Sequence, residues 1–178
     1  QVHFGGGTPN FLSPEQLGRL LESMGRNFHF SAAQDRDFSI ELDPRFVSTT
    51  DIADLAQLGF NRASLGVQDF DPAVQAAVNR LQSVEKTLDI IEACQNQGLR
   101  SVNVDLIYGL PRQTLEGFGA TLDTIIAAAP GRIAVYGYAH MPRLFKAQKQ
   151  ICQDELPDGE TRLALLTLAI DRLTSVGY

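Results

Sequence analysis

The sequence predicts an α/β fold, namely a partial (β/α) barrel with parallel strands and outer helices. Short apolar runs alternate with helical patterns along the 178 residues, and this order is typical of parallel sheets with right-handed crossovers. Three of the runs alternate polar and apolar residues, whereas a parallel strand buried on both faces is almost continuously apolar. The polar faces therefore favour a barrel whose interior holds a ligand over an open, doubly wound sheet.

The first strand ends in the glycine run of HFGGGTP, and a helix follows it. Ser13 suits the N-cap of this helix, Pro14 its first position, and Gln16 the third position of a capping box. Further strands are predicted at Phe38–Asp43, Arg62–Gln68, Ser101–Tyr108 and Arg132–Tyr138. Further helices are predicted near Asp51–Leu58, Pro72–Asn79, Ser83–Gln97, Leu115–Ala129 and Gly159–Val176.

Composition argues against several classes of function. The net charge of -6 gives no electrostatic footprint for a nucleic acid or an anionic membrane, and no apolar stretch is as long as a transmembrane helix. Only two cysteines, Cys94 and Cys152, are present, too few for a metal or cluster site of their own. Cys94 falls on the apolar stripe of its predicted helix. This composition fits a reducing compartment, so we expect a cytoplasmic protein with no nucleic-acid or membrane partner.

Polar residues occupy every second position of three predicted strands. They are Ser39, Glu41 and Asp43, then Ser64, Gly66 and Gln68, then Ser101, Asn103 and Asp105. If the apolar positions pack against helices, these polar positions line the barrel interior. Ligands of such barrels bind at the C-terminal ends of the strands, where Glu41, Gln68 and Asp105 fall. An antiparallel sheet with one wet face would show the same alternation, but the intervening helices argue against it.

The glycine run lies where a ligand would bind. Glycines permit positive φ and a close approach of the backbone, and Thr8 adds a hydroxyl group. Exposed N–H groups of such a turn can receive a carboxylate or a phosphate. The spacing matches neither the dinucleotide-binding fingerprint nor the P-loop. The residues alone therefore predict a polar ligand in a βα barrel, and an ordinary barrel enzyme with a phosphate ligand remains one alternative.

Several motifs together resemble a known family. GGGTP after a strand is similar to the S-adenosylmethionine-binding turn of radical SAM enzymes. IELDPR, FNRASLGVQDFDPAVQAAVNR, VNVDLIYGLPRQT and VYGYAHMP resemble oxygen-independent coproporphyrinogen III oxidase, so that the likeness extends over the whole chain. It implies a radical SAM barrel that oxidatively decarboxylates coproporphyrinogen III to protoporphyrinogen IX in haem synthesis, with S-adenosylmethionine, a 4Fe-4S cluster and an electron donor.

The same resemblance leaves one alternative within the superfamily. Haem chaperones share GGGTP and GVQ but bind and deliver haem, whereas LIYGLP and YAHMPRLFKAQ favour the oxidase.

The resemblance also implies a set of cofactor-binding residues. They are Gly6, Gly7, Thr8, Glu41, Gln68, Arg80, Asp105 and Ala139. The glycine turn and Thr8 would contact the methionine moiety of S-adenosylmethionine, and Glu41 would hold its ribose hydroxyls. The last four match the contacts of a second S-adenosylmethionine, Ala139 through its backbone. The alternative interpretation of Arg80 is an ordinary surface arginine that binds no cofactor. No catalytic residue and no metal ligand is assigned.

Part of the family pattern is absent from these residues. The C-x-x-x-C-x-x-C loop that holds the cluster is missing, so we expect cysteines outside this chain to bind it. Residues 1–178 are expected to form most of a radical SAM barrel domain, truncated at both ends and without the C-terminal domain. Such a fragment is expected to be inactive alone.

Four other polar residues have structural interpretations. His3 is expected to be a hydrogen-bonded core histidine more than a residue of the lumen. His140 lies at a strand end, and we expect equally that it contacts the substrate or that it does not. Asp69 and Asp71 suit turn and helix-cap chemistry.

Overall fold

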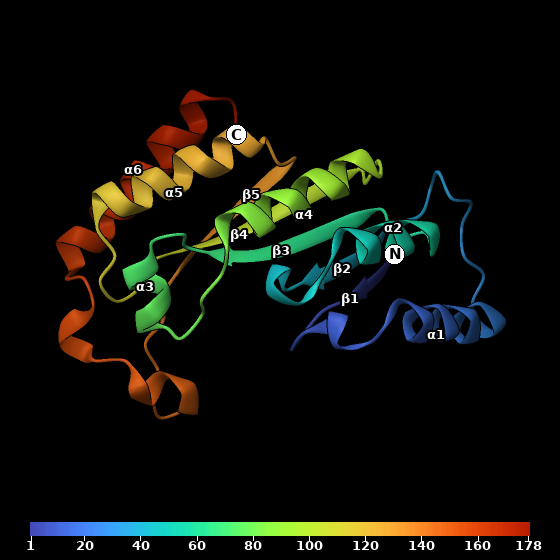
Figure 1. Cartoon of the computed structure of the whole chain (residues 1–178), viewed down its shortest axis with the longest axis horizontal. Coiled ribbons are helices and arrows are strands. Elements are labelled where there is room, and N and C mark those ends of the chain that lie inside the picture. The colour runs from blue at the N-terminus through green and yellow to red at the C-terminus, as the bar shows by residue number, and fades with distance from the viewer.

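The computed structural model describes residues 1–178, which form one five-stranded parallel sheet with helices (Figure 1). The strands are β1 (Val2–Phe4), β2 (Phe38–Leu42), β3 (Arg62–Gln68), β4 (Ser101–Tyr108) and β5 (Arg132–Gly137). Their order in the sheet is β1-β2-β3-β4-β5, the order of the chain. The predicted parallel sheet is therefore confirmed, and the predicted strand ends differ by a single residue at β2 and β5.

Five of the six helices pack in a row against one face of this sheet, and α3 (Pro72–Ala77) lies beyond the C-terminal end of β3. The five in the row are α1 (Pro14–Asn27), α2 (Thr49–Gln57), α4 (Val84–Asn96), α5 (Leu115–Ala128) and α6 (Gly159–Ser175). Contacts run from α1 to α2, α2 to α4, α4 to α5 and α5 to α6, and Figure 1 shows α4 to α6 along one side of the sheet. A doubly wound sheet carries helices on both faces, so the partial barrel is confirmed.

Four short 3-10 helices complete the chain. They are η1 (Pro9–Phe11), η2 (Pro44–Phe46), η3 (Lys146–Gln150) and η4 (Gln153–Glu155). The sequence pattern did not predict them, because a single 3-10 turn is too short to show a hydrophobic period.

Side-chain caps fix where the helices begin. Ser13 Oγ accepts from the Gln16 N–H at 3.2 Å, and Gln16 Oε1 accepts from the Ser13 N–H at 2.8 Å. This is the predicted capping box. Helix α2 begins two residues before the predicted start, because Ser48 caps it. The Ser48 side chain accepts from the Asp51 N–H, and the Asp51 carboxylate accepts from the Ser48 N–H. Asp71 caps α3 as expected, since its Oδ1 accepts from the Ala73 N–H at 2.7 Å.

The core lies between the apolar strand faces and the helices. Ile40, Leu65 and Val104 point toward the helices and are almost fully buried. Cys94 on α4 is buried among them, as predicted from its place on the apolar stripe. The opposite strand positions are only half-buried, so one face of the sheet stabilises the fold and the other is free for a site. No helix has both the length and the apolarity needed to cross a bilayer.

Candidate functional site

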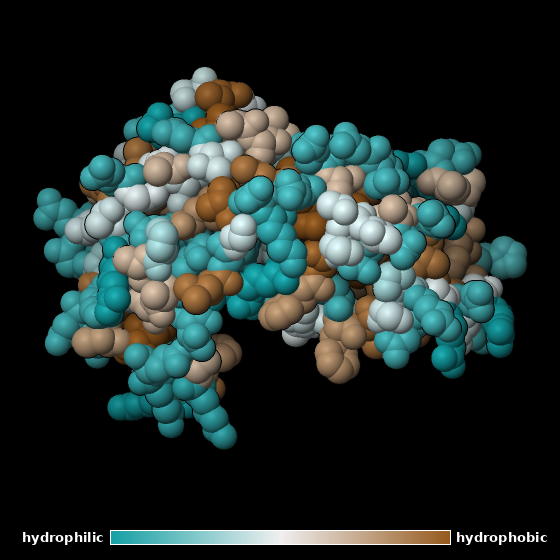
Figure 2. Space-filling model, in the orientation of Figure 1, coloured by the Kyte–Doolittle hydropathy of each residue, from teal (hydrophilic) through white to brown (hydrophobic).

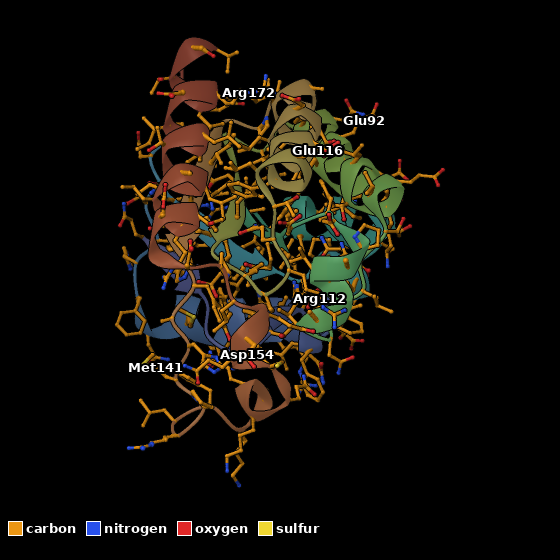
Figure 3. All side chains as sticks on the ribbon, turned by 90° about the vertical axis from the view of Figure 1, so that its left-hand side faces the viewer. Glu92, Arg112, Glu116, Met141, Asp154 and Arg172 are labelled. Atoms are coloured by element: carbon orange, nitrogen blue, oxygen red, sulfur yellow. The ribbon has the colours of Figure 1, made fainter.

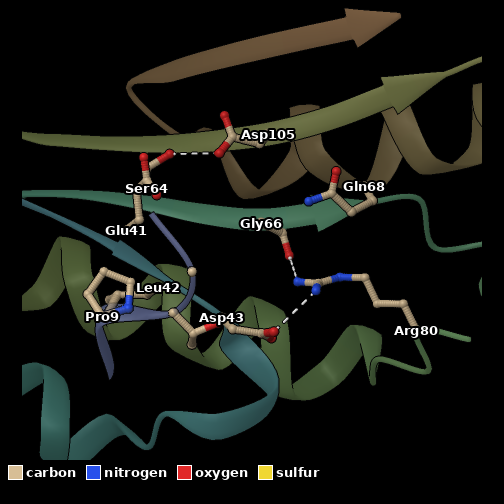
Figure 4. A pocket seen from close by; sticks show the side chains of 11 residues that line it. Pro9, Glu41, Leu42, Asp43, Ser64, Gly66, Gln68, Arg80 and Asp105 are labelled. Atoms are coloured by element: carbon tan, nitrogen blue, oxygen red, sulfur yellow. Dashed lines mark hydrogen bonds and ion pairs between the residues drawn. The ribbon is translucent and has the colours of Figure 1, made fainter. Parts of the chain in front are cut away.

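A polar cleft of about 190 Å³ lies at the C-terminal ends of β2, β3 and β4 (Figure 4). Its lining residues are Gly7, Thr8, Pro9, Glu41, Leu42, Asp43, Ser64, Gly66, Gln68, Arg80 and Asp105. A second, more apolar pocket of about 280 Å³ shares two of these residues with the cleft. It is lined by Gln68, Val78, Arg80, Ile107, Leu110, Tyr138, Ala147, Gln148 and Ile151. The predicted ligand-binding end of the strands is thus hollowed in two adjoining places.

The glycine turn closes one side of the cleft. Gly6 and Gly7 have φ of +80° and +61°, a region that residues with a side chain rarely adopt. The Gly6 N–H donates to Glu41 Oε2 at 3.0 Å, which ties the turn to β2. Thr8 precedes η1 without capping it through its side chain, so its hydroxyl is free for a ligand. The sequence therefore correctly predicted a left-handed glycine turn beside the strand ends.

Asp105 is held by two polar neighbours on the same face. Ser64 Oγ donates to Asp105 Oδ2 at 2.8 Å (Figure 4). The Asn103 amide nitrogen donates both to Ser64 Oγ and to Asp105 Oδ1, each at 2.8 Å. The carboxylate of Asp105 thus has the partners that a half-buried charge requires. The Asn103 amide oxygen is buried without a partner, which leaves one acceptor unused inside the lumen.

Arg80 belongs to a charged cluster on the cleft wall. Its Nη1 contacts Asp43 Oδ2 at 3.1 Å, and its Nη2 donates to the Gly66 carbonyl at 2.8 Å. Arg45 reaches the same carboxylate, with Nη2 2.7 Å from Asp43 Oδ2. The Nε group of Arg80 is buried without a partner. The interpretation of Arg80 as an ordinary surface arginine is therefore wrong, because α3 and the following turn direct its side chain back across β3.

Burial and charge act in opposite directions on this cluster. Burial alone raises the pKa of Asp43, but hydrogen bonds from Arg45 and the nearby charges of Arg80 and Arg45 hold this pKa below its ordinary value. Burial lowers the pKa of Arg80, and the charge of Asp43 opposes that change. An arginine stays protonated at neutral pH under such shifts. The cleft wall therefore carries a fixed guanidinium that uses two of its five N–H groups within the protein, and its charge suits an anionic or acceptor group.

The structure brings most of the predicted binding residues together, with one exception. Gly7, Thr8, Glu41, Gln68, Arg80 and Asp105 line the polar cleft. Gly6 adjoins it through its bond to Glu41. Ala139 lies past the end of β5 and lines neither pocket, and its carbonyl accepts from the Gln148 amide at 3.0 Å.

Five lining residues were missing from the predicted binding set, and two of them, Asp43 and Ser64, have polar side chains. Asp43 and Ser64 both occupy the polar positions of their strands, so the period-two alternation was the signal that could have found them.

The prediction for His3 differs from the structure, whereas the prediction for His140 stays untested. His3 stands opposite Ser39 in the β1–β2 register, on the polar face, and its side chain is 57% exposed. The expectation of a core histidine is therefore wrong, because strand β1 turns this position toward the lumen. His3 Nδ1 lies 2.8 Å from Ser39 Oγ, and Nε2 lies 3.4 Å from Glu41 Oε1. His140 is half-buried beside Tyr138, and its contact with substrate stays a prediction.

Comparison with known proteins identifies the family of this chain. A sequence profile of the radical SAM superfamily matches residues 1–125. The chain belongs to the radical SAM superfamily. Its superfamily relatives include the oxygen-independent coproporphyrinogen III oxidases of Pseudomonas aeruginosa, 46% identical over the whole chain, and of Escherichia coli, 43% identical. The chain spans 39% and 38% of the length of these two relatives.

Solved structures of other proteins agree with the sheet described above. The structure of the Escherichia coli coproporphyrinogen III oxidase, described as a radical SAM enzyme, has a TM-score of 0.95 at 43% identity. The match covers 99% of this chain and 40% of that one. The archaeal Elp3 of Methanocaldococcus infernus has a TM-score of 0.71 at 20% identity. The match covers 94% of this chain and 43% of that one, and it indicates a shared fold only.

Membership of this superfamily implies S-adenosylmethionine and a 4Fe-4S cluster, and the residues fit only the first. The cleft offers glycine N–H groups, the carboxylates of Glu41 and Asp105, and the guanidinium of Arg80, which match the acceptors, hydroxyls and charges of S-adenosylmethionine. Cluster ligands are lacking. Burial raises the pKa of Cys94 to about 12, Cys152 is exposed elsewhere, and no group of three candidate ligands exists.

Proposed function

We propose that the protein containing this chain is an oxygen-independent coproporphyrinogen III oxidase, which converts coproporphyrinogen III to protoporphyrinogen IX in haem biosynthesis. One observation carries the proposal. Relatives of that name are up to 46% identical over all 178 residues, and the solved structure of one of them has a TM-score of 0.95 against this fold. So high a similarity includes the strands and the glycine turn that line the cleft.

The proposed cofactor arrangement uses both pockets. The turn at Gly6 and Gly7, with Thr8, would receive the methionine moiety of a first S-adenosylmethionine, and Glu41 its ribose hydroxyls. Support comes from the left-handed backbone of the turn and from its contact with Glu41. With an electron from the 4Fe-4S cluster, bound S-adenosylmethionine would supply the radical that abstracts a hydrogen atom and begins decarboxylation.

A second S-adenosylmethionine would lie against Gln68, Arg80, Asp105 and the backbone of Ala139. The first two of these residues line both pockets, which adjoin at that point.

A basic segment beside the second pocket suits an anionic substrate. Arg143, Lys146 and Lys149 are exposed and form no ion pair, although the chain is acidic overall. Figure 2 shows a hydrophilic tip on the lobe at lower left, where Figure 1 draws the part of the chain that contains η3. Coproporphyrinogen carries carboxylates on its propionate side chains, and unpaired cations attract such groups.

The base of this lobe is fixed to the barrel. The Arg112 N–H donates to the Glu155 carbonyl at 2.8 Å, and Arg112 Nη2 lies 2.6 Å from Glu155 Oε1. Figure 3 shows Arg112 and Asp154 near this junction. A fixed lobe holds its cations at a constant distance from the pocket, which supports their proposed role in substrate binding.

The proposal extends to the parts that this chain does not supply. Residues 1–178 would form most of the barrel domain, and cysteines outside them would hold the 4Fe-4S cluster. An electron donor would be the other partner. We place the protein in the cytoplasm, without a nucleic-acid or membrane partner, on the support of two free cysteines and a net charge of -6.

The test follows coproporphyrinogen III by mass, using the whole protein prepared without oxygen and with its cluster loaded. The assay runs with and without S-adenosylmethionine, on the wild type and on Gln68→Ala and Asp105→Ala. Asp123→Ala is the matched control, because this exposed carboxylate pairs with Arg172 on the helix side. Cofactor-dependent loss of two carbon dioxides, weakened only in the two cleft variants, is expected. Tight haem retention without decarboxylation would instead indicate a haem carrier.

A further inference from the structure

Gln68 stands at the centre of a strained turn. The Asp69 N–H donates to the Val67 carbonyl at 3.0 Å, and Gln68 has φ of +70°. A three-residue turn with a positive central φ is a rare and strained γ-turn for a residue that has a side chain. The pairing of β3 with β4 shifts register at the same place, between Gly66 and Gln68. The backbone is therefore distorted at the residue whose side chain enters the cleft.

The distortion determines where the Gln68 amide lies. The side chain folds back over Gly66, so that a Cβ atom on Gly66 would lie 3.0 Å from Gln68 Nε2 and 3.2 Å from Arg80 Nη2. Figure 4 shows this amide on the same side of the sheet as Asp105 and near the Arg80 guanidinium. The missing side chain at Gly66 leaves the room that both groups need.

A buried carboxylate follows the strained residue directly. Asp69 is 2% exposed, and its carboxylate accepts from the Asp71 N–H at 2.8 Å, from Thr121 Oγ1 at 2.8 Å and from the Gln113 amide. Its carbonyl accepts from the Gln75 amide at 3.0 Å. Burial raises the pKa of Asp69, and the three donors oppose this change. Donors from α3, α5 and the loop after β4 thus fix the position next to the γ-turn.

The same network fixes the end of the neighbouring strand. Gln113 Oε1 accepts from the Gly109 N–H at 2.6 Å, and its amide nitrogen donates to the Ile107 carbonyl at 3.0 Å. Thr121 Oγ1 also accepts from the Phe70 N–H at 3.1 Å. The network therefore joins the C-terminal ends of β3 and β4, the strands that carry Gln68 and Asp105.

We propose that Asp69, together with Gln113 and Thr121, is a positioning residue that holds Gln68 in its strained turn, with its amide facing the cofactor in the cleft. The inference rests on the proposed binding of S-adenosylmethionine by Gln68. If the network served only to anchor α5, it would not need Gln68 to have a positive φ beside Asp69. Strain persists in folded proteins where surrounding contacts over-determine it, and Asp69 supplies those contacts.

The first experiment measures strain and binding at Gln68 itself, in the whole protein with its cluster. Gln68→Ala and Gln68→Gly both remove the amide, but only glycine accepts φ near +70° without strain. We expect the glycine variant to melt about 2 °C above the alanine variant, and both to bind S-adenosylmethionine about tenfold more weakly in equilibrium dialysis. Ala129→Gly is the control, because Ala129 has φ of +47° at the end of α5. It should raise the melting temperature and leave affinity unchanged.

The second experiment tests whether the network acts through Gln68. Thr121→Val removes the hydroxyl at nearly constant volume, and we expect about tenfold weaker S-adenosylmethionine binding. Thr121→Ser keeps the hydroxyl and should restore the affinity. In a Gln68→Ala background, Thr121→Val should weaken binding no further, whereas its effect on melting temperature should persist.

The outcomes separate the inference from the proposed function. A wild type that does not bind S-adenosylmethionine overturns both. A wild type that binds it while Gln68→Ala binds equally well overturns the role of Gln68, and the inference with it. If Gln68 matters but Thr121→Val lowers only the melting temperature, or weakens binding equally in the Gln68→Ala background, the network is a structural anchor and the inference alone is wrong.

Discussion

Replacing Asp43 by Asn tests the charged cluster on the cleft wall. Asp43 is 8% exposed, and its carboxylate lies between two guanidinium groups, with Oδ2 2.7 Å from Arg45 Nη2 and 3.1 Å from Arg80 Nη1. Asparagine keeps the shape of the side chain but has one acceptor oxygen and no charge. In Asp43→Asn the two arginines would therefore repel each other across a neutral amide.

The size of the effect follows from how buried the arginines are. Removing one partner of a fully buried ion pair destabilises a protein by about 3–5 kcal/mol, whereas exposed pairs contribute about 0–1 kcal/mol. The side chains of Arg45 and Arg80 are 26% and 24% exposed, so solvent screens part of the loss. We expect Asp43→Asn to lower the free energy of unfolding by about 2–3 kcal/mol at neutral pH.

Urea unfolding across a range of pH provides the assay. The variant should unfold at a lower urea concentration with an unchanged slope. The folded-state pKa of Asp43 is lowered from 3.8, so its stabilising contribution is complete above that value and is lost as the pH falls through the folded pKa. The wild type and the variant should therefore converge in strong acid. A difference below about 1 kcal/mol at neutral pH, or one that is undiminished in acid, would refute this reasoning.

Three further predictions concern separate parts of the chain. Gly66→Ala should weaken S-adenosylmethionine binding about tenfold in equilibrium dialysis, because the new Cβ displaces the Gln68 and Arg80 side chains; unchanged affinity would contradict this. Ser13→Ala should lower the free energy of unfolding by about 1 kcal/mol in urea titration, because α1 loses its capping box, and a neutral result would show that packing alone fixes its start. Alkylation at pH 8, mapped by peptide mass, should modify Cys152 and spare Cys94 until the protein unfolds, since burial raises the pKa of Cys94 to about 12; rapid labelling of Cys94 in the native state would disprove its burial.

The sequence predicted the fold well because its strands carry two signals at once. Alternation in FSIEL, RASLGVQ and SVNVDLIY placed the apolar residues against the helices and the polar ones in the lumen, and the structure confirms both faces. Helix starts were predictable where a cap and a hydrophobic stripe coincide, as at Ser13. His3 was misplaced because β1 has only three residues, too few to show which face a position takes.

The site was only partly predictable, for a different physical reason. Glu41 and Gln68 lie at the ends of β2 and β3, and Asp105 lies on the same face within β4, so alternation identifies all three. Asp69 gave no such signal, because its role depends on donors about 40 to 50 positions away, at Gln113 and Thr121. A single sequence cannot show which distant polar groups meet in a buried network, nor that a glutamine adopts a positive φ.

The order of the strands has a consequence for synthesis of the protein on the ribosome. Every strand pairs with the one that precedes it in the chain, so each new strand finds its partner already translated and can add to an existing edge. Pairings between neighbours in sequence close shorter loops and form faster than distant ones. The strands that line the cleft are all in place once β4 has paired with β3, with Asp105 opposite Gly66. A nascent chain would therefore form the polar cleft before β5 and α6 have been made, whereas the second pocket needs residues that follow β5.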